Sequence, residues 1–111
     1  MNSTRQNKVA RLIQKELGCI FQKESRNFFK GILITVTVVR ISPDLSSAKI
    51  YLSLFPTNNK DEILSLISKN NKIIRHELAK RIRHQFRAVP QLTFFLDDTL
   101  DYMENIDSLL N

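Results

Sequence analysis

Glycine and cysteine are scarce in this chain of 111 residues, and each scarcity excludes a kind of site. Gly18 and Gly31 are the only glycines, so the sequence contains neither a GxGxxG loop nor a Walker-type phosphate loop. The single cysteine, Cys19, excludes an intramolecular disulfide, a CxxC pair and a cysteine-rich zinc cluster. A lone cysteine usually packs as a small hydrophobic side chain, and this composition is typical of a reducing cytoplasm.

Long apolar stretches are absent as well. The longest, from Ile32 to Val39, is interrupted by Thr35 and Thr37 and is too short to span a bilayer. The N-terminus has no apolar signal core. Hydrophobic residues nevertheless make up 42% of the chain, which is enough for the core of one domain. We therefore expect a soluble, cytoplasmic protein that makes no contact with a membrane.

The charge is distributed unevenly along the sequence. The net charge is +6, and every Lys and Arg lies at or before Arg87. Residues 1–87 carry 17 basic against six acidic residues, or +11, whereas residues 88–111 carry five acids and no base, or −5. A basic body of this kind concentrates polyanions around it. This favours nucleic acid as a partner over the alternative that the basic surface serves solubility alone.

No arrangement of residues indicates catalysis or metal binding. Cys19 has no histidine in its own predicted helix, and His76 and His84 are eight residues apart, whereas a shared metal needs a helical spacing of three or four. The C-terminal acids lack the central glycine of an EF-hand loop. A solvated face is the favoured interpretation of these acids, which are Asp97, Asp98, Asp101, Glu104 and Asp107. We predict a protein that is not an enzyme and that uses no metal and no cofactor.

Two predicted helices, 4–24 and 72–87, each combine an apolar stripe with a basic side. The apolar residues recur at helical spacing and span about 120° of each helix. We call the opposite, Lys- and Arg-rich sides the basic faces. If the helices pack side by side on one face of a sheet, the basic faces can merge into one phosphate-binding surface. The predicted phosphate contacts are Lys8, Arg11, Lys15, Lys72, His76, Lys80, Arg83 and Arg87.

Two predicted strands, 32–41 and 47–55, lie between these helices, and a further helix is predicted at 60–69. The short turn Ser42-Pro43-Asp44 favours antiparallel pairing of the two strands. Val89-Pro90 ends the last long helix and starts a third strand, whose core face carries Leu92, Phe94 and Leu96. We expect one domain at 1–97 and an acidic segment at 98–111 that contains a short helix.

Four residues complicate this simple pattern. Arg75 projects onto the apolar edge of its predicted helix, so either its side chain snorkels or the helix starts with a kink. Ile73 projects onto the exposed side, which also favours a kink near Asn71. Tyr51 and Phe55 lie on the wetter side of strand 47–55. Cross-strand packing is the favoured interpretation of these two aromatic residues, and stacking on nucleic-acid bases is the alternative.

The element order α-β-β-α-α-β resembles the type II KH fold. KH domains clamp single-stranded RNA with a GxxG loop between two helices. The sequence has Asn70-Asn71-Lys72 at that joint, so the GxxG loop is absent. The resemblance implies an α+β, KH-like domain, with a three-stranded sheet and helices packed on one of its faces.

Three stretches within residues 5–97 resemble the ribosome-binding factor A family. Residues 9–17 (VARLIQKEL) are similar to its opening helix, and residues 42–52 (SPDLSSAKIYL) are similar to its second-strand motif. Ile74-Arg75 followed by residues 89–97 (VPQLTFFLD) resembles its most distinctive stretch. The family usually has an Ala-x-Gly kink at the joint where this sequence has Asn70-Asn71-Lys72.

This resemblance implies a non-enzymatic assembly factor. It would bind the free 30S small ribosomal subunit through 16S rRNA and promote late maturation of the subunit, including processing of the 16S rRNA 5′ end. It would also support growth at low temperature. Ribosomal proteins and assembly GTPases are further partners that the resemblance implies, and we expect a monomer. Two alternatives stay open: a general RNA- or DNA-binding regulator that uses helix 72–87 for recognition, and a protein-interaction module for an acidic partner.

Overall fold

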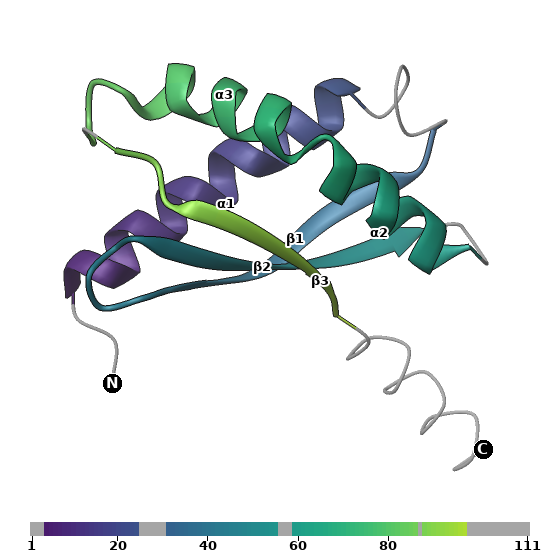
Figure 1. Cartoon of the computed structure of the whole chain (residues 1–111), viewed down its shortest axis with the longest axis horizontal. Coiled ribbons are helices and arrows are strands. Elements are labelled where there is room, and N and C mark those ends of the chain that lie inside the picture. Colours follow the sequence, from purple (N-terminus) through teal and green to yellow (C-terminus); the bar gives the residue numbers. More distant parts are fainter. Residues whose placement is uncertain (1–3, 25–30, 56–58, 87, 98–111) are drawn as a thin grey trace, which may run out of the picture.

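A sheet covered on one side by helices makes up the part of the chain that the structure describes, residues 4–24, 31–55, 59–86 and 88–97 (Figure 1). In this computed structural model the elements in chain order are α1 (Thr4–Glu24), β1 (Leu33–Ile41), β2 (Ser47–Phe55), α2 (Lys60–Lys69), α3 (Asn71–Ile82) and β3 (Gln91–Leu96). The order and the layering confirm the predicted α+β architecture. No helix in these ranges has both the length and the apolar character that a membrane crossing requires. The predicted helix within 98–111, and hence the domain boundary at residue 97, lies outside the described residues.

β2 is the central strand of the sheet. It pairs antiparallel with β1, from Phe55 opposite Leu33 to Ala48 opposite Ile41, as the short turn predicted. It pairs parallel with β3, starting with Ser47 opposite Gln91. A parallel pair needs a long crossover, and α2 and α3 supply it.

The β1–β2 turn is held by side chains as well as by the backbone. Leu45 has a positive φ of 62°, which a non-glycine residue adopts only where its surroundings impose it. The Asp44 carboxylate accepts hydrogen bonds from the hydroxyls of Ser42 and Ser46, each at 2.7 Å. These bonds favour the charged carboxylate and lower the pKa of Asp44 from 3.8 to about 2.

The core lies between the helices and the sheet face that they cover. Alternate residues of the strands point into it, among them Ile50 and Leu52, which are fully buried. Phe21 of α1 meets Phe94 of β3 edge to face, with ring centroids 6.1 Å apart and an interplanar angle of 74°. The predicted apolar stripes are buried as far as they lie in helices: Val9, Ile13, Leu17, Ile20 and Phe21 in α1, and Ile74, Leu78 and Ile82 in α3. Phe86, the last residue of the predicted stripe of 72–87, lies beyond the end of α3 and is half-buried.

Two glutamines of α1 bind the backbone of β1. Gln6 Nε2 donates to the Ile41 carbonyl at 2.9 Å, and Gln14 Nε2 donates to the Val36 carbonyl at 3.0 Å. The second contact falls where the β1–β2 register shifts, between Val36 and Val38. The amides therefore fix how α1 crosses β1, and α1 in turn presents its other side to solvent.

The predicted kink lies at Asn70, between α2 and α3. The Asn70 backbone N–H donates to the Leu66 and Ile67 carbonyls, and its side-chain amide donates to the Leu66 carbonyl at 2.8 Å. Asn71 Nδ2 donates across to the Leu92 carbonyl of β3, also at 2.8 Å. The two asparagines thus terminate one helix and attach the next to the sheet. The change of direction leaves Ile73 exposed, as its position on the predicted helix indicated.

The prediction that the last long helix continues to residue 87 is wrong. α3 ends at Ile82, residues 83–85 form a turn, and the backbone N–H groups of Gln85 and Phe86 both donate to the Ile82 carbonyl. The early end has a tertiary cause, because the chain must reverse here to bring β3 alongside β2. Arg75 holds that return: its guanidinium donates to the carbonyls of Val89 at 2.6 Å and Pro90 at 3.1 Å.

Candidate nucleic-acid interface

The two basic faces share the helical side of the molecule. α1 and α3 pack against each other, and each buries its apolar stripe toward the sheet, so their opposite sides both point away from it (Figure 1). Arg81 of α3 and Glu16 of α1 form an ion pair of 3.2 Å between the helices. Arg81 follows the predicted contact Lys80 in the sequence, but its guanidinium is engaged by the Glu16 carboxylate.

All three predicted contacts on α1 are exposed. Lys8, Arg11 and Lys15 follow one another at spacings of three and four residues, so they form one row along the helix. The described residues place no carboxylate within hydrogen-bonding distance of this row. Three exposed cations in a row present their full charge to a polyanion.

The predicted contacts on α3 are exposed as well, and they form a second row. Lys72, His76 and Lys80 recur every four residues, and Arg83 follows in the turn just beyond the helix. Lys80 lies 3.6 Å from Glu77, but an exposed pair of this kind contributes little and leaves the ammonium available to a phosphate. Arg83 donates to Nε2 of His84 at 3.4 Å. The eighth predicted contact, Arg87, lies outside the described residues.

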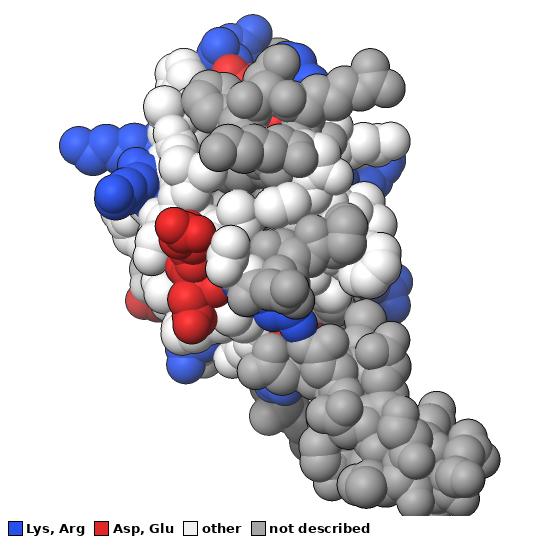
Figure 2. Space-filling view, turned by 90° about the vertical axis from the view of Figure 1, so that its right-hand side faces the viewer, with Lys and Arg blue, Asp and Glu red and all other residues white. Residues whose placement is uncertain are grey.

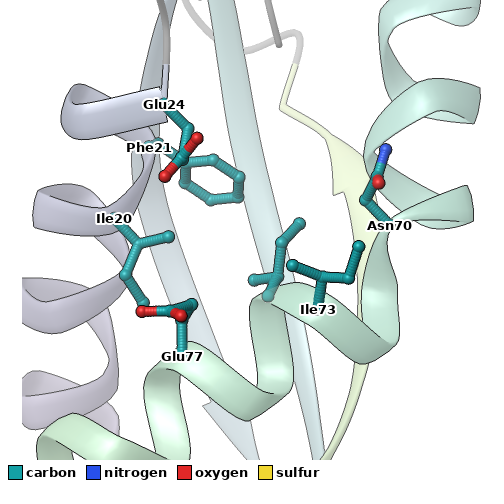
Figure 3. Close-up of a pocket in the computed structure, with 7 residues that line it drawn as sticks. Ile20, Phe21, Glu24, Asn70, Ile73 and Glu77 are labelled. Atoms are coloured by element: carbon teal, nitrogen blue, oxygen red, sulfur yellow. The ribbon is translucent and has the colours of Figure 1, made fainter. Parts of the chain in front are cut away.

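An apolar hollow of about 70 Å³ opens between the C-terminal part of α1 and the start of α3. Ile20 and Ile73 lie on opposite sides of it, and Glu24 and Glu77 stand at its edge (Figure 3). Carboxylates repel phosphate, so this hollow does not extend the phosphate-binding surface. The hollow lies beyond the C-terminal end of the α1 row, beside the start of the α3 row.

Figure 2 shows the end of the molecule where α2 lies. From this side the Lys and Arg side chains are spread around the outline, and acidic side chains gather between them. Asp61 and Glu62 are exposed in the first turn of α2, where they favour the helix dipole. Among the described residues of this end, acidic side chains separate the cations (Figure 2).

In the described residues, His, Cys, Asp and Glu side chains form no group of three that could hold a metal ion. Cys19 is exposed beside a shallow groove between α1 and β1, contrary to the expectation of a packed cysteine. Position 19 lies outside the apolar arc of α1, which explains its exposure.

The uncovered face of the sheet carries exposed cations and aromatic residues, and its cations are not among the predicted phosphate contacts. Arg40 of β1 and Lys49 of β2 are both exposed and lie directly opposite each other. Tyr51 stacks on Phe95 of the neighbouring strand, as cross-strand packing predicts, with centroids 5.4 Å apart and an interplanar angle of 26°. Phe55 is exposed. The alternation of strand 47–55 predicts that Lys49, Tyr51 and Phe55 share one side of the strand. Which residues of β1 and β3 lie next to them is known only from the strand register of the structure.

The element order, the parallel third strand and the one-sided helical layer define an α+β domain of the KH-like class. The family model for ribosome-binding factor A matches residues 5–110. The chain belongs to the ribosome-binding factor A family.

Relatives and solved structures agree with this assignment. The chain is 50% identical to ribosome-binding factor A of Cytophaga hutchinsonii over 111 residues, which cover all of this chain and 84% of that protein. The crystal structure of ribosome-binding factor A from Thermus thermophilus superposes with a TM-score of 0.67 at 25% identity, covering 82% of this chain and 94% of that one. A homology model of the Thermus thermophilus protein, fitted into a cryo-electron microscopy map of its 30S complex, matches with a TM-score of 0.60 at 25% identity, covering 87% and 96%.

Proposed function

We propose that this protein is a non-enzymatic assembly factor that binds the free 30S ribosomal subunit through 16S rRNA. The observation that carries the proposal is the exposure of all seven described basic-face residues on the helical side of the fold. They are Lys8, Arg11, Lys15, Lys72, His76, Lys80 and Arg83. The relative that was fitted into a 30S complex supports the choice of this particular RNA-containing partner.

The proposed mechanism is electrostatic docking on folded rRNA. Lys and Arg contacts to phosphates supply affinity and orientation without reading sequence, so the selectivity has to come from the shape of the RNA that spans both rows. A ligand shifts a conformational equilibrium only by its different affinity for the two states. Binding therefore stabilises the rRNA conformation in which phosphates face the α1 row and the α3 row together.

The biological role follows from stabilising one rRNA conformation. We propose that the protein acts late in maturation of the subunit, that it promotes processing of the 16S rRNA 5′ end, and that it supports growth at low temperature, where misfolded rRNA is slow to rearrange. It acts as a cytoplasmic monomer. Ribosomal proteins that border the site, and assembly GTPases that assist its release, complete the set of proposed partners.

The test is co-sedimentation of the purified protein with 30S, 50S and 70S particles across a salt series. Selective binding to free 30S particles that falls steeply with salt is the expected result. Equal binding to all particles and to bulk RNA would contradict the proposed selectivity. Stronger binding to duplex DNA than to 30S particles at physiological salt would point to a nucleic-acid-binding regulator instead.

A further inference from the structure

The sheet face opposite the helices exposes an unusual set of large apolar side chains. Leu33 is 59% exposed, Val38 37%, Phe55 68% and Phe95 37%, and the partly buried Tyr51 lies beside Phe95 on the same face. A solvated sheet face normally carries polar residues. Apolar side chains gathered on one face mark a binding surface more often than chance exposure.

The strand register arranges the aromatic residues into two separate platforms. Tyr51 of β2 pairs with Phe95 of β3, and their rings stack. Phe55 lies four residues further along β2, about 13 Å away at the usual rise per residue, and is paired with Leu33 of β1. Stacked nucleotides in a strand are only about 3.4 Å apart, so bases that occupy both platforms must belong to an extended, unpaired strand.

Two cations stand at the opposite end of this row. Arg40 and Lys49 face each other across β1 and β2, both exposed, and Lys49 lies about 7 Å along β2 from Tyr51. On the described part of this face Asp97 is the carboxylate, and Thr37 Oγ1 donates a hydrogen bond to it. The order along the face is therefore a cation pair, an aromatic pair and a third aromatic ring.

We propose that the open face of the sheet binds single-stranded RNA. Bases stack on Phe95 and on Phe55, and the phosphates at the other end contact Arg40 and Lys49. Sheet-based RNA-binding domains use aromatic side chains on their strands in this manner, and non-specific single-strand binders combine such rings with cations. The centre of a protein–protein interface is depleted of charge, so the adjacent cation pair favours RNA over a protein on this face. The inference does not rest on binding of the 30S subunit.

Phe55 separates base stacking from ordinary apolar contact. Phe55→Leu keeps an apolar side chain but removes the flat ring, whereas Phe55→Tyr keeps the ring. The probe is a fluorescein-labelled ten-residue oligouridine, and its affinity is measured by fluorescence anisotropy alongside that for a short RNA hairpin. Ile73→Leu, on the exposed side of α3, is the matched apolar control.

Phe55→Leu is expected to weaken oligouridine binding by about 5- to 150-fold, the range for loss of one stacked base, and to affect the hairpin less. Phe55→Tyr and Ile73→Leu should bind as the wild type does. Arg40→Gln combined with Lys49→Gln should lower the salt dependence of oligouridine binding by about 1.4 in log–log slope.

Oligouridine binding by Phe55→Leu within twofold of the wild type would overturn the proposal, and so would equal losses for oligouridine and hairpin. Self-association of the wild type that Phe55→Leu abolishes, with RNA binding unchanged, would assign this face to a protein partner. Phe55 is largely exposed, so the variant leaves the core intact, and a melting midpoint equal to that of the wild type verifies this.

Discussion

Reversing two charges on the α3 row gives the most direct test of the basic faces. Lys72→Glu combined with Lys80→Glu changes the net charge from +6 to +2 and alters only exposed side chains. Lys23→Glu combined with Lys69→Glu makes the same change in charge at exposed helical positions outside the basic faces. The comparison therefore separates contact with phosphate from a general loss of positive charge.

The expected magnitude follows from the number of contacts. Six described basic-face residues are charged at pH 7, namely Lys8, Arg11, Lys15, Lys72, Lys80 and Arg83. At about 0.9 released counterions per contact, the slope of log affinity against log salt is about −5.4 for the wild type and about −3.6 for the α3 variant. Between 50 and 200 mM salt, affinity then falls about 2,000-fold for the wild type and about 150-fold for the variant.

The assay is equilibrium binding to purified 30S subunits at four or more salt concentrations, with circular dichroism to verify the fold of each variant. The control variant should keep the slope of the wild type, because its lysines contact no phosphate. If the α3 variant keeps that slope, or if both variants lose it equally, the assignment of the α3 row as a phosphate-binding surface is refuted.

Three other predictions concern stability and the acidic segment. Phe94→Ala should lower the free energy of unfolding, measured by urea titration, by about 3–5 kcal/mol, since it opens a cavity against Phe21; a loss below about 1 kcal/mol would contradict this. The Asp44 pKa is lowered to about 2, so the stability that its hydrogen bonds contribute is fully present above the unfolded pKa near 3.8 and is lost as pH falls through about 2. Asp44→Asn should remove that pH dependence from acid titrations, and an unchanged acid profile would speak against it. Deleting 98–111, which carries four acids and no base, should raise affinity for random RNA in filter binding, and equal affinity would exclude the segment as an electrostatic shield.

Periodicity in the sequence correctly predicted the structural features that depend on residues close together along the chain. The buried stripes of α1 and α3, the β1–β2 hairpin and the kink at Asn70 all follow from spacing, turn residues and helix termini. Exposure of the six described basic-face residues on α1 and α3 followed from the same helical spacing, because each lies opposite a buried stripe, whereas Arg83 is exposed in the turn beyond α3. The expectation that Cys19 is packed followed from the average behaviour of cysteine. Its position outside the apolar arc of α1 would have predicted the exposure that the structure shows.

Contacts between distant parts of the chain were beyond this reasoning. The end of α3 depends on where β3 must begin, and neither the parallel β2–β3 register nor the partners of Arg75 can be read from local spacing. Whether Arg81 is free to contact RNA or forms an ion pair with Glu16 depends on how α1 crosses α3. For the same reason, the sequence alone did not predict that Arg40 and Lys49 lie opposite each other, because this depends on the register between β1 and β2.

The attachment of β3 to α3 has a consequence for how the domain opens. Asn71 and Arg75 bind the backbone at the start of β3 and just before it, at Leu92, Val89 and Pro90. Because these bonds tie α3 to β3, we expect the two elements to open together and to exchange their amide hydrogens as one unit. The hairpin of β1 and β2, which closes locally, is free to outlast that unit during partial unfolding. A strand at the edge of the sheet thereby governs whether the helix that carries three of the seven described basic-face residues keeps its shape.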